Sequence, residues 1–310
     1  MILDNGFVIN APIHLLPSFK ISPFQTIDIY KNKKLSSVEG LGIEEYLLDR
    51  FVKKSIQLTD DGRSALNIAL ATLKLRKNDI VTIFTTTNKP YISSCVTNEI
   101  EKYCLWSRNI QKNTKVILVN HEFGYCSQKM KEYSDLGYPI IEDFAHSFIS
   151  NSEINDAGNY GDFLVFSFSK YFPIQVGGAL LYSKDLNIKP EIKNNVKEYI
   201  RNICSSYISL IPKIKEKRLK NYEYYSRLFS TIGLKEYFEL KENDCPAVFC
   251  VEIPKKINLN KLKIFVNSQG IESSVFYGEN AYFLPCHQNL EKCDIEYIFF
   301  VVKFFLEANK

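Results

Sequence analysis

The sequence contains no run of five basic residues and no apolar stretch long enough to cross a membrane. Its 39 Lys and Arg residues exceed the 35 Asp and Glu residues by only 39 − 35 = 4, and they are scattered along the chain. Nucleic-acid-binding proteins usually carry a concentrated basic patch, so no nucleic-acid partner is expected. The most apolar stretch, residues 297–306, is interrupted by Lys303, whereas a membrane-spanning helix needs about 20 apolar residues. We therefore predict no membrane partner either.

Cysteine pairs with C-x-x-C spacing are also missing, although the chain has eight cysteines. Widely spaced cysteines of this kind indicate small core residues in a reduced protein, not a disulfide framework. The first five residues lack the basic segment of a secretory signal, so we expect a cytoplasmic location. None of the four histidines, His14, His121, His146 and His287, shows H-x-x-x-H or comparable ligand spacing. No metal site is therefore predicted.

Strand-like and helical patterns alternate along the first part of the chain. Residues 63–75 place apolar side chains at the spacing of a buried helical face, whereas short apolar runs predict buried strands. The strand-like runs are residues 79–84, 116–119, 163–166 and 178–182. Such alternation is typical of an α/β fold with a mainly parallel sheet. We predict a large α/β domain over residues 1–185, including an N-terminal segment of about 40 residues.

The pattern changes after residue 185. Residues 187–227 are rich in Lys and Tyr and are helical in pattern. A strand at residues 247–253, a helix near 258–268 and a final amphipathic segment at 294–307 follow. This mixture predicts a smaller α+β domain over residues 186–310.

One helix begins with a sequence that suits an anion. Asp61 and Gly62 precede Arg63 and Ser64 at the start of the apolar helical pattern. The free amides and the positive dipole end of a helix N-terminus can bind a phosphate. Taken alone, however, an ordinary turn followed by an N-cap explains the pattern more simply.

An acid and a lysine follow two of the buried strands. Glu142 and Asp143 come directly after residues 140–141, and ligands of open α/β sheets bind at the carboxyl ends of the strands. The Asp143 carboxylate could hold a buried cationic nitrogen, but solvated acids at strand ends are equally common. Lys170 follows residues 163–166, where a poorly solvated lysine becomes a nucleophilic amine able to form a Schiff base. Most lysines at strand ends are simply solvated.

Five segments have the order and separations of one known family. They are residues 62–70 (GRSALNIAL), 119–124 (VNHEFG), 141–146 (IEDFAH), 158–168 (GNYGDFLVFSF) and 284–287 (LPCH). In this order the sequence resembles the DegT/DnrJ/EryC1/StrS sugar aminotransferases, which are pyridoxal-phosphate enzymes of aspartate aminotransferase fold type I. The resemblance implies a three-layer sandwich around a mainly parallel sheet, with a smaller C-terminal α+β domain.

The resemblance assigns catalytic roles to three residues. Lys170, followed by Gly177 and Gly178, fits the lysine that holds pyridoxal 5'-phosphate as an internal aldimine and then moves the proton. Asp143 would pair with the pyridinium nitrogen and keep it protonated, so that the ring acts as an electron sink. His146 would lie near the ring and its 3-oxygen.

Further residues are implied as cofactor-binding groups. The amides of Gly62, Arg63 and Ser64 would bind the phosphate together with the hydroxyl of Ser167. Tyr91 is the candidate for the aromatic side chain that stacks on the ring, although residues 85–90 depart from the usual family sequence.

The resemblance implies transfer of an amino group from glutamate to a keto sugar, linked to a nucleotide, in bacterial surface-glycan or amino-sugar biosynthesis. It also implies a homodimer, because fold type I sites form between subunits. Two alternatives stay open. Sugar dehydratases of the same family carry His in place of the lysine, whereas this chain has Lys170. The short chain, with no Arg-rich loop after Leu180, is instead compatible with a degenerate, non-catalytic subunit that dimerises or binds.

Overall fold

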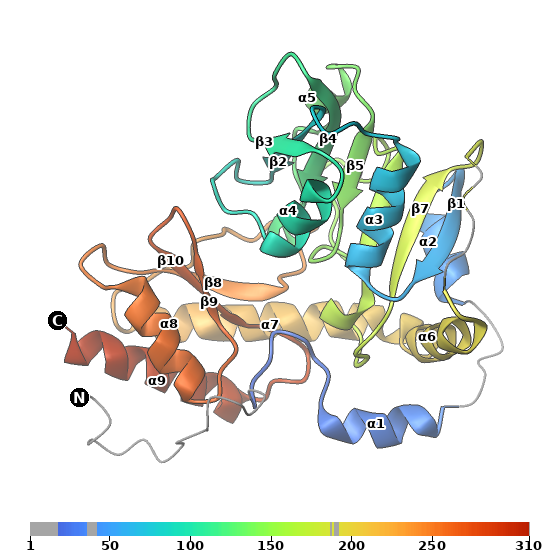
Figure 1. Ribbon diagram of the computed structural model, residues 1–310. Coiled ribbons are helices and arrows are strands. Elements are labelled where there is room, and N and C mark those ends of the chain that lie inside the picture. Colours follow the sequence, from blue (N-terminus) through green and yellow to red (C-terminus); the bar gives the residue numbers. More distant parts are fainter. Residues whose placement is uncertain (1–17, 36–41, 187, 189–191, 310) are drawn as a thin grey trace. The chain divides into compact units, whose positions relative to one another are not determined.

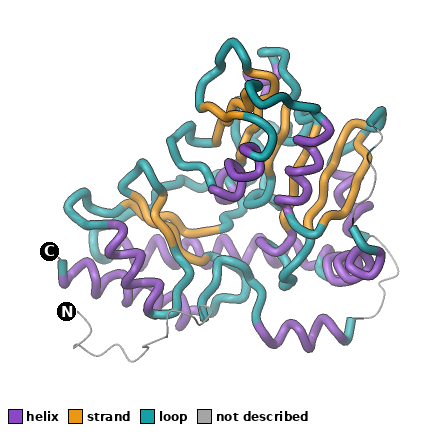
Figure 2. Tube along the Cα trace, in the orientation of Figure 1, coloured by secondary structure: helices purple, strands orange, loops and turns teal. Residues whose placement is uncertain are grey.

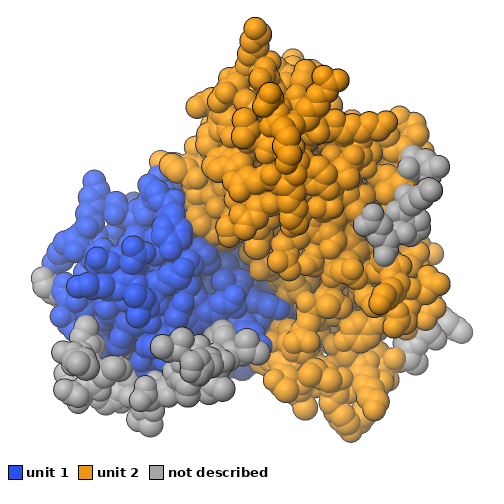
Figure 3. Space-filling model, viewed as in Figure 1, with its two compact units in different colours: residues 1–23, 213–240, 246–310 blue, residues 24–212, 241–245 orange. Residues whose placement is uncertain are grey.

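The computed structural model describes residues 18–35, 42–186, 188 and 192–309 (Figure 1). Contacts divide the chain into two compact units, which Figure 3 colours separately. The larger unit comprises Phe24–Pro212 with Lys241–Cys245, and the smaller one comprises residues 1–23, 213–240 and 246–310. No described helix has the length and apolar character needed to cross a membrane. The first five residues and His14, which entered the predictions of location and metal binding, lie outside the described residues.

A sheet of seven strands, counted over the described residues, forms the centre of the larger unit (Figure 2). Its order is β1 (Lys54–Thr59), β7 (Gly178–Ser183), β6 (Phe163–Ser167), β5 (Ile140–Asp143), β4 (Thr114–Asn120), β2 (Ile80–Thr85) and β3 (Leu105–Ser107). Strands β3, β2, β4, β5 and β6 run parallel, whereas β7 is antiparallel to both β6 and β1. The prediction of an α/β fold with a mainly parallel sheet is confirmed.

Helices cover both faces of this sheet, and the alternation of side chains along the strands explains why. Successive residues of a strand point to opposite faces. In β4, Val116 and Leu118 pack in one core with α3 (Gly62–Thr72) and α4 (Ser94–Glu101). Ile117 and Val119 pack in a separate core with α5 (Met130–Ser134). Because both faces are covered, the strand is apolar at successive positions.

The larger unit contains further helices besides α3, α4 and α5. They are α1 (Thr26–Lys33), α2 (Ile43–Arg50), α6 (Asn194–Ser206) and the short η4 (Ile208–Leu210). Arg201 of α6 forms two hydrogen bonds of 2.6 and 2.7 Å with Glu44 of α2. Contacts of this kind group residues 186–212 with the larger unit, whereas the sequence pattern assigned them to the smaller domain. The division into a large domain ending at residue 185 and a smaller domain beginning at residue 186 stays a prediction.

The smaller unit is built on an antiparallel sheet with helices. Its strands are β8 (Val248–Glu252), β10 (Ala281–Pro285) and β9 (Ser274–Phe276), with β10 in the middle. The helices are α7 (Ile211–Ser230), α8 (Leu259–Ser268) and α9 (Lys292–Ala308). The rings of Tyr225 and Phe229 pack on Phe249 of β8 at centroid distances of 4.8 and 5.4 Å. The predicted mixture of strands and helices is thus present in this unit.

Candidate active site

Polar residues meet where three parallel strands of the larger unit end. Asn120, the last residue of β4, pairs with Asp143, the last residue of β5. Asp143 in turn pairs with Val165 of β6, which is two residues before Ser167. Ligands bind at this carboxyl edge in open α/β sheets. Register therefore places the predicted acid close to the strand end that leads to Lys170.

The carboxylate of Asp143 is buried and held from two sides. Its Oδ1 accepts a hydrogen bond from the Ala145 amide at 2.9 Å, and its Oδ2 accepts one from Asn120 Nδ2 at 2.8 Å. Burial raises the pKa of Asp143, while these hydrogen bonds and the nearby positive charge of Lys170 oppose the rise. A buried carboxylate gains by pairing with a cation, because the cation offsets its lost solvation. Asp143 is therefore suited to bind a protonated nitrogen.

Lys170 ends the short helix η3 (Phe168–Lys170), which follows β6 directly. Phe168 is fully buried and fixes this turn, since its amide donates to the Gly177 carbonyl at 2.9 Å. The Lys170 side chain is half-buried, and its charge acts on Asp143. An amine and a buried acid thus lie at the ends of neighbouring strands.

Aromatic rings connect two of the other predicted residues. The ring of Phe123 lies 5.7 Å from the ring of Tyr91 and 5.4 Å from that of His146, as measured between centroids. Phe123 belongs to the short helix η2 (Glu122–Gly124) after β4, and its φ of 51° lies in the left-handed region. Such a conformation is costly for a residue with a bulky side chain and clusters at functional sites. The sequence motif at residues 119–124 contains Phe123 but predicted no role for it.

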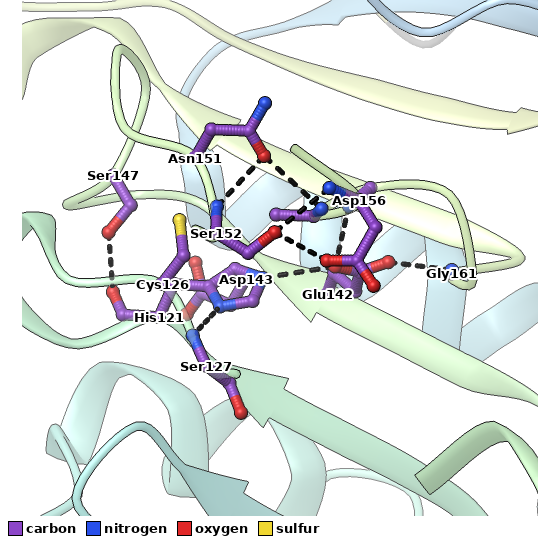
Figure 4. A network of polar contacts seen from close by, with 12 residues as sticks. His121, Cys126, Ser127, Glu142, Asp143, Ser147, Asn151, Ser152, Asp156 and Gly161 are labelled. Carbon is purple, nitrogen blue, oxygen red and sulfur yellow. Dashed lines mark hydrogen bonds and ion pairs between the residues drawn. The ribbon is translucent and has the colours of Figure 1, made fainter. Parts of the chain in front are cut away.

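A buried network fixes the loops around Asp143 (Figure 4). Glu142 is fully buried and accepts hydrogen bonds from the Gly158 amide at 2.9 Å and the Gly161 amide at 2.7 Å. His121 Nε2 lies 3.0 Å from Glu142 Oε2. Because His121 Nδ1 accepts from the Ser127 amide at 3.1 Å, the ring proton is on Nε2 and donates to Glu142.

The sequence motifs did not predict this network, although three of its segments, residues 119–124, 141–146 and 158–168, belong to these motifs. A signal was available, because Glu142 and His121 are polar residues at the ends of otherwise apolar strands. Buried polar groups require partners, so these residues had to find each other or another polar group. The spacing along the chain did not identify which partner each would take.

The start of α3 carries the predicted anion-binding residues. Asp61 is the N-cap, and its Oδ1 accepts from both the amide and the hydroxyl of Ser64, at 2.8 and 2.9 Å. The amides of Gly62 and Arg63 have no acceptor among the described residues, as is usual for the first amides of a helix. A Cβ atom on Gly62 would lie 3.1 Å from Cβ of Ser167, so these two residues are in contact.

Two glycines bring this helix start against the sheet. A Cβ atom on Gly178 would lie 2.6 Å from the Asp61 carbonyl carbon and 2.6 Å from the Phe166 carbonyl oxygen. Only glycine can occupy this position without moving backbone atoms. Gly177 has a φ of +109°, and its amide donates to the Asp60 carbonyl. The paired glycines therefore hold the start of α3 beside the end of β6.

These groups fit pyridoxal 5'-phosphate. Two helix amides and the hydroxyl of Ser167 suit a phosphate. Asp143 suits a protonated ring nitrogen, and Lys170 on the neighbouring strand end provides an amine for the aldehyde. No group of three or more His, Cys, Asp or Glu side chains within the described part of the chain could hold a metal ion.

Solved structures share this fold at low sequence identity. The aminotransferase TlmJ from Streptoalloteichus hindustanus is 16% identical, with a TM-score of 0.69 over 86% of this chain and 90% of that one. PseC from Helicobacter pylori, an aminotransferase involved in the biosynthesis of pseudoaminic acid, is 16% identical, with a TM-score of 0.69 over 94% and 99%. A DegT DnrJ EryC1 StrS aminotransferase from Brucella abortus is 15% identical, with a TM-score of 0.65 over 84% and 88%.

The curated proteins contain no match to this sequence. A family model described as "Putative PLP-dependent aminotransferase" matches residues 49–227, which is more than half of the chain. The matched segment includes the start of α3, Asp143 and Lys170. The chain belongs to the family of pyridoxal-phosphate-dependent aminotransferases.

Proposed function

We propose that this chain moves an amino group from glutamate to a keto sugar linked to a nucleotide, as a step in bacterial surface-glycan or amino-sugar biosynthesis. The carrying observation is the pair of Lys170 and buried Asp143 at the ends of neighbouring parallel strands in an aminotransferase of this family. The choice of a sugar rests on the resemblance of the motifs and on the shared fold with PseC. Glutamate would leave as 2-oxoglutarate, and the keto carbon of the sugar would become an amine.

The position of each site residue suggests its proposed role in the reaction. When bound, the cofactor supplies an electron sink for moving the proton between carbons. Asp143 would keep the ring nitrogen protonated, and Lys170 would hold the cofactor and carry the proton. Tyr91 and His146, which both contact Phe123, would flank the ring.

The phosphate would be bound by the amides of Gly62 and Arg63 and by the hydroxyl of Ser167. Ser64 was predicted to join them, and its amide and hydroxyl donate to Asp61. Ser64 would reach the phosphate only by giving up these bonds.

The test combines cofactor attachment with transfer. Purified chain is incubated with pyridoxal 5'-phosphate and reduced with borohydride, and mass spectrometry locates the added mass. We expect it on Lys170, with no addition at this site in Lys170→Ala. Lys129→Ala is the matched control, because the Lys129 side chain is 57% exposed and its ion pair with Glu132 is 3.9 Å long.

Transfer is then measured as 2-oxoglutarate formed from glutamate with free and nucleotide-linked keto sugars. Formation that depends on the nucleotide-linked sugar supports the proposal. Attachment to Lys170 without transfer to any acceptor would favour the non-catalytic subunit, and loss of a sugar hydroxyl without amination would favour the dehydratase.

Two further proposals concern assembly and location. We propose a homodimer, and the exposed apolar side chains of α1, Ile27, Ile29 and Tyr30, are candidates for covering by a second copy. Sedimentation equilibrium checks this, and a monomer at micromolar concentration would contradict it.

A cytoplasmic location is supported by the eight cysteines, all of which are thiols in the structure.

A further inference from the structure

The start of α3 already carries a negative charge. Asp61 Oδ1 accepts from the Ser64 amide and hydroxyl, and Asp61 Oδ2 accepts from Arg63 Nη2 at 2.9 Å and Nε at 3.3 Å. Burial disfavours the charged form of Asp61, but these hydrogen bonds outweigh burial and lower its pKa. The carboxylate is therefore ionised at neutral pH.

This charge conflicts with binding of a phosphate at the same helix end. The amides of Gly62 and Arg63 belong to the same turn as the Asp61 carboxylate. A phosphate on these amides would be repelled by the carboxylate, because like charges close together repel even in bulk water. A Ser or Asn N-cap would cap the helix equally well without this repulsion. The carboxylate therefore needs a cation beside it when a phosphate is bound.

Arg63 is the cation that the structure provides. Its guanidinium has five N–H donors, of which the Asp61 carboxylate takes only some. The Arg63 side chain is 62% exposed and lines an open pocket of about 370 Å³. It therefore has room to turn between Asp61 and a ligand on the first turn of α3.

We propose that the Arg63 guanidinium is shared between Asp61 and the phosphate of pyridoxal 5'-phosphate, and that this pair sets how tightly the phosphate binds. The inference rests on the proposed function, because it assumes that the cofactor occupies this site. Asp61 holds Arg63 near the helix start in the empty site and competes for it in the occupied one. Arg63 thus contributes through its side chain as well as its amide.

The test compares two aldehydes that differ only in the phosphate. Dissociation constants for pyridoxal 5'-phosphate and for pyridoxal are measured by absorbance titration of wild type and variants. Arg63→Gln should weaken pyridoxal 5'-phosphate binding roughly tenfold to a hundredfold, the range for a charged hydrogen bond, and should change pyridoxal binding by less than about twofold. Asp61→Asn, which keeps an N-cap, should tighten pyridoxal 5'-phosphate binding by about threefold to tenfold.

Lys102→Gln is the matched control. Lys102 is another exposed cation that lines the same pocket, and it pairs with Glu99. Removing it deletes the same charge without touching the start of α3, so its effect should be smaller and should fade in high salt. If Lys102→Gln and Arg63→Gln weaken binding of pyridoxal 5'-phosphate equally, the summed positive charge of the pocket explains the effect and the proposal is wrong.

Further outcomes separate this inference from the proposed function. If wild type binds both aldehydes and Arg63→Gln changes both equally, only the inference fails. If wild type binds neither aldehyde, the proposed function fails and the inference with it. If Asp61→Asn lowers the thermal midpoint of unfolding, the proposal is tested by the cofactor binding of Arg63→Gln alone. Arg63→Gln serves for this because the Arg63 side chain is mostly exposed.

Discussion

Replacing Glu142 with Gln should destabilise the larger unit. Glu142 is fully buried and accepts from three donors, His121 Nε2, the Gly158 amide and the Gly161 amide. A glutamine can turn its oxygen toward His121 and Gly158, but its NH₂ group then faces the Gly161 amide, which is also a donor. One charged hydrogen bond is lost, and a buried amide is left without an acceptor.

The expected loss is about 3 kcal/mol, because a hydrogen bond to a charged group contributes about 1.5–3 kcal/mol and an unsatisfied buried donor costs about 1–3 kcal/mol. This is a large part of a total stability of about 5–15 kcal/mol. Urea denaturation followed by circular dichroism measures the free energy of unfolding. The same variant should bind cofactor more weakly, because Glu142 precedes Asp143 and pins the loops on both sides of it.

Glu132→Gln is the control for Glu142→Gln, since the Glu132 side chain is 70% exposed and lies 3.9 Å from Lys129. Exposed ion pairs of this kind contribute about 0–1 kcal/mol. A loss below about 1 kcal/mol in Glu142→Gln would refute the argument, because it would mean that the three donors find other acceptors when the loops relax.

Three other changes test separate features of the site. Glu122 is buried, and burial raises its pKa although Thr87 donates to Oε2 twice at 2.7 Å. A raised acid pKa makes the free energy of unfolding of the wild type fall as pH rises from about 4.5 through the folded pKa. Glu122→Gln should therefore gain stability relative to wild type between pH 4 and pH 8 in urea titrations. A constant difference in free energy of unfolding between the two proteins would contradict this. Gly178→Ala should cost about 1–3 kcal/mol or more in thermal unfolding because its Cβ would meet backbone at 2.6 Å, whereas Gly42→Ala, with its nearest atom at 3.7 Å, should be tolerated. Lys170→Arg keeps the charge but removes the amine, and transfer should fall by at least about 10²-fold in the 2-oxoglutarate assay; retained transfer would exclude Lys170 from the chemistry.

Much of the sheet could be predicted because its signal is local. Apolar runs at residues 79–84, 116–119, 163–166 and 178–182 coincide with β2, β4, β6 and β7. A strand buried on both faces must be apolar at successive positions, and this is visible in any short window. Strand β1 is different, since residues 54–59 alternate polar and apolar side chains at the sheet edge. No prediction was made for it.

The partners within the site could not be predicted from spacing. Asn120 and Asp143 are 23 residues apart, and His121 and Glu142 are 21 residues apart. Both pairs form because β4 and β5 are adjacent parallel strands in a fixed register. The sequence showed which residues were polar at strand ends, but strand order, which the sequence did not specify, decided which of them met.

The glycines after Lys170 link the two halves of the site. Gly178 lets β7 approach the backbone of Asp61, and this contact seats the start of α3 against the end of β6. Gly62 then lies beside Ser167, only three residues before Lys170. A side chain at Gly178 would push α3 away, and it would separate the amides that we propose to bind phosphate from the amine that we propose to hold the cofactor. With the proposed roles, the absence of a Cβ atom at Gly178 therefore helps to set the distance between the amides proposed to bind phosphate and Lys170.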